Sequence, residues 1–180
     1  MIERTRDSIL RAFNQLIIRY DLSQITVDMI IKNSKVSKAT FYRYFKDKYD
    51  VMNLNYKLLL DELSSPKISS SYLELYEHLF EYGQKKWKFL QRAFEMQGTN
   101  SMYEYIASYS KNLVFEITAD NRNGGTLTST EEFQLDIFLA GISTIYKTYI
   151  FDKYQLPPHE AAKALYDLMP LSLRTMWWTS

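Results

Sequence analysis

Glycine and proline are scarce in this chain: five of the 180 residues are glycine and four are proline. These two residues interrupt helices most strongly, and long stretches of the sequence contain neither of them. Apolar residues make up 46% and charged residues 24%, which supplies a globular core and argues against a disordered chain. The sequence therefore predicts an all-α globular protein.

Several classes of protein are disfavoured by what the sequence lacks. Without cysteine it cannot form a disulfide scaffold, a thiolate metal site or a cysteine nucleophile. Residues 1–7 lack the apolar core of a signal peptide, and no apolar run approaches the roughly 20 residues that span a bilayer, so we expect a cytoplasmic protein. Because no glycine-rich phosphate loop, G-x-S-x-G turn or H-E-x-x-H helix is present, we expect neither an enzyme nor a bound cofactor.

A metal site is not expected either. Glu74 and His78 lie four residues apart and would share a helix face, which offers two ligands, but the second histidine, His159, is remote in sequence. Glu77 and Glu81 make a solvated acidic face the simpler interpretation.

Charge is distributed unevenly along the chain. Residues 1–60 hold eleven Lys or Arg against six Asp or Glu, a net charge of +5, whereas residues 61–180 carry a net charge of −4. A basic N-terminal third joined to an acidic remainder indicates that one end of the molecule meets a polyanion.

The N-terminal third divides into helices with recognisable ends. Apolar residues at helical spacing predict an amphipathic helix over residues 6–20. Thr26 is placed to cap a second helix that runs to about Asn33. The next three residues, Ser34-Lys35-Val36, leave room only for a turn between helices.

Two more helices follow this turn. Ser37 is placed to cap a short helix that runs to Phe45, and Asp47 to cap a fourth helix that runs to about Leu63. A longer helix followed by two short helices with a turn of three or four residues between them is the pattern of a helix-turn-helix, whose second short helix enters the DNA major groove.

The third helix has two distinct faces. Phe41 and Phe45 lie four residues apart and would point to the core, so that Ala39 and Arg43 point away from it. The small Ala39 would allow close approach to DNA, and Arg43 offers donors for guanine or phosphate. The remaining polar residues on and beside this face are expected to contact phosphates: Thr26, Thr40, Tyr42, Lys46 and Lys48, with Lys38 near the helix start.

The same residues carry a resemblance to a known family. Residues 25–27 read ITV and residues 36–48 read VSKATFYRYFKDK, which closely resembles the DNA-binding domain of TetR-family transcriptional regulators over about residues 5–63. The resemblance implies an all-helical homodimer with three DNA-binding helices, a linking fourth helix and a larger helical domain that binds a small ligand. The positions of family DNA contacts match Thr26, Lys38, Ala39, Thr40, Tyr42, Arg43 and Lys48.

Two positions depart from the family pattern. Ser34-Lys35 stands where the family has Ala-Gly, and a left-handed residue other than glycine at position 35 should cost about 1 kcal/mol. Ile31 stands where the family prefers a small residue. These departures leave open an alternative, a coregulator that keeps the fold and binds another protein instead of DNA.

A serine-rich segment, residues 64–71, follows the fourth helix and contains Pro66. It predicts a boundary between a DNA-binding domain with its linking helix, residues 1–63, and a ligand-binding and dimerisation domain, residues 64–180. Helices are expected at about residues 72–82, 87–98, 100–118, 131–154 and 159–169, with Gly83 ending or kinking the first and Thr130 capping the fourth. This region is similar to a Firmicutes-type subgroup that includes regulators like the activator of dihydroxyacetone kinase genes.

The second region also supplies candidates for two further contacts. Its aromatic residues predict a pocket for an unknown small-molecule effector, lined by Tyr76, Phe80, Trp87, Phe94, Tyr103, Phe115 and Tyr146. By resemblance to the family, the helices near residues 131–154 and 159–169 would form the dimer contact, with Phe138, Gly141, Ile142 and Ile145 in it. Trp177-Trp178 would either pack across the dimer or cover a local groove.

Taken together, the sequence predicts a ligand-responsive transcriptional repressor. We expect it to bind a near-palindromic site in double-stranded DNA as a homodimer.

Overall fold

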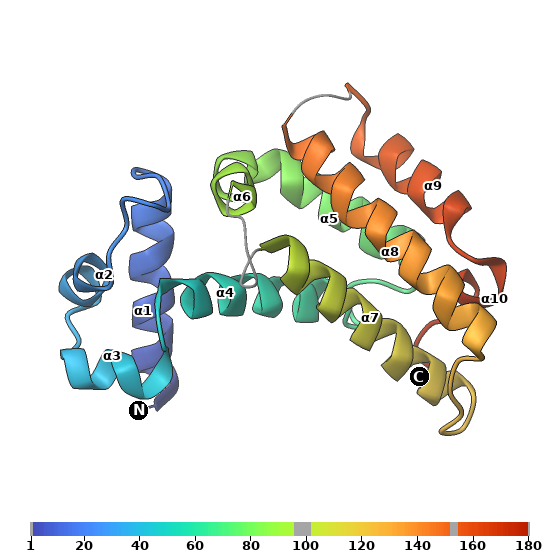
Figure 1. The fold of residues 1–180 in the computed structure, drawn as a ribbon, viewed down its shortest axis with the longest axis horizontal. Coiled ribbons are helices and arrows are strands. Elements are labelled where there is room, and N and C mark those ends of the chain that lie inside the picture. Colours follow the sequence, from blue (N-terminus) through green and yellow to red (C-terminus); the bar gives the residue numbers. More distant parts are fainter. Residues whose placement is uncertain (1, 96–101, 152–154, 180) are drawn as a thin grey trace. The chain divides into compact units, whose positions relative to one another are not determined.

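The computed structural model describes residues 2–95, 102–151 and 155–179, and within them it contains ten helices and no strand (Figure 1). The all-α prediction is therefore confirmed. Contacts divide the chain into two compact units, one of Met1–Leu59 with Lys88–Met102 and the other of Leu60–Trp87 with Tyr103–Ser180. No helix of the described ranges is both long and apolar enough to cross a bilayer.

The first unit contains α1 (Ile2–Ile17), α2 (Val27–Ser34), α3 (Lys38–Tyr44), most of α4 (Lys48–Leu63) and most of α6 (Trp87–Phe94). Its centre is made of apolar side chains that are completely buried: Ile9, Phe13, Ile17, Ile25, Ile30, Phe41, Val51, Met52, Leu90 and Ala93. α2 packs against both α1 and α3.

The first helix ends earlier than its apolar pattern predicts. α1 stops at Ile17, where the amide groups of Arg19 and Tyr20 both donate to the carbonyl of Leu16 at 2.9 Å. These bonds turn the chain, so that Tyr20 lies outside the helix and its side chain is exposed.

The second unit contains α5 (Tyr72–Lys85), α7 (Met102–Asn121), α8 (Ser129–Ile150), α9 (Pro158–Leu168) and the short α10 (Leu171–Arg174). α5 packs extensively against α9 and also contacts α8, and Figure 1 shows α8 and α9 running side by side. Of the two alternatives expected at Gly83, an end or a kink, the end is wrong, because α5 continues through it to Lys85. A Cβ at Gly83 would lie 2.7 Å from the Cδ1 atom of Ile150, so the glycine permits close packing here.

α8 begins before the position that the sequence suggests. Its N-cap is Thr128 and not Thr130: the Thr128 hydroxyl accepts from the amide of Glu131, whose carboxylate accepts in return from the Thr128 amide. Arg122 binds both oxygens of the same carboxylate, at 2.6 and 3.0 Å. Arg122 therefore connects the cap of α8 to the loop that precedes it.

The serine-rich segment where the sequence places the domain boundary is folded into turns. Ser64 and Ser69 are buried, and the Ser69 hydroxyl donates to the carbonyl of Leu63, the last residue of α4, at 2.7 Å. The division of the chain by contacts lies inside α4, between Leu59 and Leu60.

The two C-terminal tryptophans bind the backbone of the serine-rich segment. The Trp177 indole donates to the Ser69 carbonyl at 2.8 Å, and the Trp178 indole donates to the Ser64 carbonyl at 3.0 Å. Thr179 adds two bonds to the carboxylate of Asp120. The sequence left open whether these tryptophans pack across a dimer or within the chain, and all of these bonds are made within the chain.

Candidate nucleic-acid interface

The predicted caps of the N-terminal helices are present. The Thr26 hydroxyl accepts from the amide of Met29 at 3.2 Å, and the Ser37 hydroxyl accepts from the amide of Thr40 at 3.1 Å. Asp47 accepts from the amides of Tyr49 and Asp50, at 2.8 and 3.0 Å. Each cap satisfies amide groups that the helix itself leaves without partners, which fixes where the helix begins.

The turn between α2 and α3 has the left-handed residue that the family resemblance implies at position 35. Lys35 adopts the left-handed conformation, with φ of 57° and ψ of 29°. The Ser8 hydroxyl of α1 donates to the carbonyl of the preceding Ser34 at 3.0 Å. The departure from glycine at this position is therefore accommodated without loss of the helix-turn-helix.

α3 presents the predicted faces. Phe41 and Phe45 are buried, with ring centroids 5.8 Å apart, while Tyr42 packs edge-on against Phe41 and keeps half of its surface exposed. Ala39 and Arg43 are exposed on the outer side. The outer side of α3 therefore offers a small residue, a phenol and a guanidinium to a partner.

The other polar candidates surround this face. Thr26, Lys38 and Lys46 are exposed, while Thr40 is half-buried and exchanges a 2.8 Å hydrogen bond with the Ser37 hydroxyl. The cations near the face make it attractive to an anionic partner. We use the name DNA face for the surface formed by these residues, which the sequence predicts to bind DNA: Thr26, Lys38, Ala39, Thr40, Tyr42, Arg43 and Lys46.

Lys48 is arranged differently from its neighbours. Its ammonium group is half-buried and donates to the carbonyls of Leu22 at 2.6 Å and Ile25 at 2.7 Å, with that of Ser23 at 3.5 Å. Burial lowers the pKa of Lys48, and the nearby Asp47 opposes that shift. The ammonium is thus directed at the protein backbone.

The residues predicted to line an effector pocket do not gather at one place. Phe80 and Tyr146 lie in contact, with centroids 5.6 Å apart, while Tyr76 is buried and donates to the sulfur of Met169. Phe94 belongs to the first unit. Trp87 and Phe115 are exposed, and the side chain of Tyr103 lies outside the described residues.

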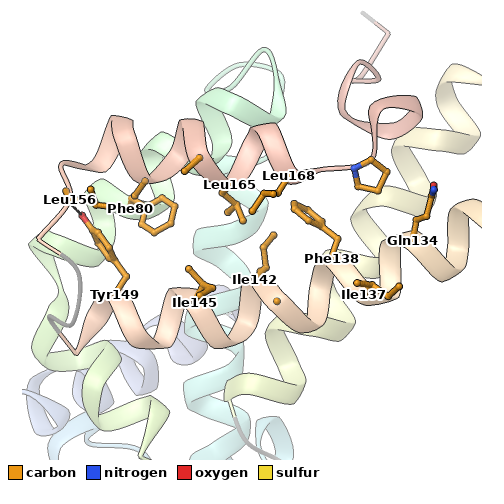
Figure 2. Close-up of a pocket in the computed structure, with 14 residues that line it drawn as sticks. Phe80, Gln134, Ile137, Phe138, Ile142, Ile145, Tyr149, Leu156, Leu165 and Leu168 are labelled. Atoms are coloured by element: carbon orange, nitrogen blue, oxygen red, sulfur yellow. Dashed lines mark hydrogen bonds between the residues drawn. The ribbon is translucent and has the colours of Figure 1, made fainter.

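A long apolar groove of about 630 Å³ runs between α8 and α9 (Figure 2). All four residues predicted for the dimer contact line it: Phe138, Gly141, Ile142 and Ile145. The sequence analysis missed its other apolar walls, Ile137 on α8 and Ala161, Ala164, Leu165 and Leu168 on α9. Their spacing of three and four residues on adjoining helices is the signal that could have found them.

Glu74 and His78, the residues weighed as metal ligands, each bind serines of the adjoining turn. The Glu74 carboxylate accepts from the amide and hydroxyl of Ser70, and His78 Nδ1 lies 3.0 Å from the Ser69 hydroxyl. Those bonds to Ser70 lower the pKa of Glu74. Within the described part of the chain, no group of three or more His, Cys, Asp or Glu is placed to hold a metal ion.

Comparison with known proteins gives two family matches. Residues 9–53 match the family described as bacterial regulatory proteins, tetR family, and residues 70–170 match a transcriptional regulator C-terminal region. The sequence has no significant match among curated proteins.

Three solved structures illustrate the similarity in fold. The dihydroxyacetone kinase operon activator DhaS is 18% identical, with 96% of this chain and 98% of that chain covered and a TM-score of 0.66. A TetR transcriptional regulator from Streptococcus agalactiae 2603V is 17% identical, with 94% and 96% covered and a TM-score of 0.65. The fatty acid degradation regulator FadR from Bacillus halodurans is 18% identical, with 94% and 96% covered and a TM-score of 0.60.

Proposed function

Because this chain belongs to the TetR family and is a DNA-binding transcriptional regulator, we propose that it binds a near-palindromic operator as a homodimer. One α3 from each subunit enters one of two successive major grooves. The observation that carries this proposal is the exposed side of α3, where Ala39, Tyr42 and Arg43 point outward while Phe41 and Phe45 anchor the helix from behind.

The roles of the DNA face follow from side-chain chemistry. Arg43 carries a planar guanidinium that can donate to both acceptors of one guanine, so it is proposed to read a base. Tyr42, Lys38, Lys46 and the hydroxyl of Thr26 are proposed to bind phosphates, which fixes the register of the helix without reading sequence.

The first experiment is a mobility shift with the DNA that flanks the protein's own gene, at two salt concentrations, with a random-sequence duplex pool as comparison. Selective binding that weakens with salt is expected, because phosphate contacts release counterions.

Two variants test the roles on α3. Arg43→Ala should lower the discrimination against other bases at one base pair by about 1–3 kcal/mol, whereas Tyr42→Ala should weaken binding to all DNA sequences equally. Lys147→Ala, at an exposed position on α8, is the control. Failure to bind either DNA overturns the proposal.

The groove between α8 and α9 is proposed as the surface that a second copy covers. It is lined almost wholly by apolar side chains, and 60% of Ile137, 42% of Ile145 and 76% of Leu168 are exposed in a single chain. Large contiguous apolar surfaces are typical of interfaces between subunits. Ile145→Glu should therefore yield monomers in sedimentation equilibrium, while Lys147→Glu on the same helix should leave a dimer. If the Ile145→Glu variant remained a dimer, the contact between subunits would have to lie outside this groove.

An effector site is proposed within the second unit. Its support is chemical: the hydroxyls of Tyr72 on α5 and Thr118 on α7 are buried and have no hydrogen-bond partner among the described residues. Buried polar groups are normally paired, so a polar ligand group would complete them. A metabolite that raises the melting temperature of the wild type should lose that effect on Tyr72→Phe. An equal effect on both proteins would exclude Tyr72 from the site.

Repression is the proposed sign of regulation. A dimer that fills two successive major grooves excludes other proteins from the same DNA, so an operator that overlaps a promoter blocks transcription. A reporter driven by the bound promoter should rise when the regulator's gene is removed. A fall in the reporter would instead indicate an activator.

A further inference from the structure

The loop between α1 and α2, residues 18–26, contains carbonyl groups that local turns do not satisfy. Amides within the loop donate to the carbonyls of Asp21, in the loop, and Leu16, in α1. Four loop carbonyls, from residues 20, 22, 23 and 25, and that of Ile17 at the end of α1 face two cations that lie far away in the sequence. Thr26, the cap of α2 and a member of the DNA face, directly follows this loop.

The first cation is Lys48, in the first turn of α4. Its Nζ atom lies 2.6 Å from the carbonyl oxygen of Leu22, 2.7 Å from that of Ile25 and 3.5 Å from that of Ser23, and each of these contacts joins residues more than twenty positions apart in the sequence. An ammonium group has three donors and no acceptor, so this arrangement engages its hydrogen-bonding capacity. Little of it remains for a phosphate.

The second cation is Arg92, on α6, which belongs to the same compact unit as the loop. Its guanidinium donates to the carbonyl of Ile17, the last residue of α1, and to that of Tyr20 at 2.8 Å, while its Nε lies 3.4 Å from the carboxylate of Asp21. A cation at a helix C-terminus also interacts favourably with the helix dipole.

Resting on the function proposed above, we propose that Lys48 and Arg92 are positioning residues for DNA binding. They fix the α1–α2 loop, and with it Thr26 and the start of α2, and neither cation contacts phosphate in the complex. The two residues would then affect DNA affinity through the shape of the DNA face and not through their charge.

The test compares Lys48 with its exposed neighbour Lys46, using a duplex that the full-length wild type selects from a random pool. Affinity is measured over a range of salt concentrations for Lys46→Met, Lys48→Met and Lys48→Arg. Lys46→Met should lower the salt slope by about one. Lys48→Met should weaken binding about tenfold with the wild-type slope, and Lys48→Arg should not restore it, because a planar fork does not fit three convergent carbonyls.

Three results would overturn the assignment of Lys48. A slope reduced by one in Lys48→Met would identify a phosphate ligand, and wild-type affinity in Lys48→Arg would show that the carbonyls do not require an ammonium group. Wild-type affinity in a folded Lys48→Met, checked by its thermal transition, would show that the carbonyl contacts have no effect on DNA binding.

Arg92 provides the parallel test from outside the helix-turn-helix. Arg92→Met should weaken binding without changing the slope, whereas Arg19→Met, at an exposed position of the loop itself, serves as the control. Unchanged affinity in Arg92→Met would remove Arg92 from the proposal.

Amide hydrogen exchange separates this proposal from the proposed function. Amides of residues 22–30 should exchange faster in Lys48→Met and Arg92→Met than in the wild type, and unchanged exchange would overturn the proposal. If the wild type selects no duplex while exchange does quicken, the proposed function fails and the fixing of the loop by these cations stands.

Discussion

At the scale of the residue, Lys35 is held in a conformation that suits glycine. Its φ of 57° places Cβ close to the following carbonyl oxygen, which strains the backbone. The side chain is exposed, so burial of apolar surface does not offset this strain. Lys35→Gly should raise the free energy of unfolding in urea by about 0.5–1 kcal/mol, after the greater freedom of glycine in the unfolded chain is subtracted. Lys32→Gly, inside α2, should lower it by about 1 kcal/mol. A destabilised Lys35→Gly would contradict the argument.

Glu131 gives a residue-scale prediction for pH. Its hydrogen bonds with Arg122 and Thr128 lower its pKa to about 2. The ionised carboxylate therefore stabilises the fold at pH values above its ordinary pKa of 4.5, and this contribution is lost as the pH falls toward 2. Urea midpoints between pH 5 and pH 2.5 should fall less steeply in Glu131→Gln than in the wild type. Arg122→Met should show a similarly reduced slope, and a wild-type slope in both variants would refute the assignment.

Local interactions are the part of the site that the sequence predicts well. Thr26, Ser37 and Asp47 cap their helices through amides two or three residues away, and Lys35 is left-handed, as the family's glycine at that position implies. The partners of Lys48 and Arg92 lie 23 to 75 residues distant, so no spacing rule points to them. Only the folded unit brings those groups together.

At the scale of the element, the existence of helices was predictable and several of their ends were not. α5 continues through Gly83, whose lack of a Cβ leaves room for the side chain of Ile150, a contact between two helices that the local sequence does not contain. α8 begins at Ser129 because Thr128 and Glu131 form a reciprocal cap, although Thr130 has the same side chain. Both differences involve a second residue, Ile150 beside Gly83 and Glu131 beside Thr128, and the spacing of apolar residues does not identify either contact.

At the same scale, the C-terminal segment is hydrogen-bonded to the backbone at the end of α4. The Trp178 indole donates to the carbonyl of Ser64, directly after α4, and the Trp177 ring packs edge-on against the Tyr72 ring, with centroids 4.9 Å apart. Trp178→Phe keeps an aromatic ring and removes the donor, so it should lower the free energy of unfolding by about 1 kcal/mol. Trp178→Ala should cost more, because it also removes apolar burial. Equal unfolding midpoints for Trp178→Phe and the wild type would show that the hydrogen bond contributes nothing.

At the scale of the whole molecule, the sequence predicts which end meets DNA but only part of the surface proposed for the partner subunit. The basic first 60 residues contain the helix-turn-helix, so charge and motif agree. The groove is built from α8 and α9 together, and its α9 wall includes Leu165 and Leu168, of which Leu168 is 76% exposed in a single chain. Surfaces shared by two helices need the packing of both to be known.

Substitutions of Gly141 allow the stability of one subunit and the assembly of two subunits to be measured separately. A Cβ built on Gly141 meets no atom within 4 Å in a single chain, so the absence of a side chain there is not required by the subunit's own packing. Gly141→Ala should stabilise α8 in an isolated subunit by up to about 1 kcal/mol, because alanine favours helix over glycine. Gly141→Arg should leave the subunit folded by circular dichroism and yet shift sedimentation equilibrium toward monomer, because a long charged side chain would stand in the proposed apolar contact. A Gly141→Arg variant that stays dimeric, with Lys147→Glu as the surface control, would show that the second copy does not cover this groove.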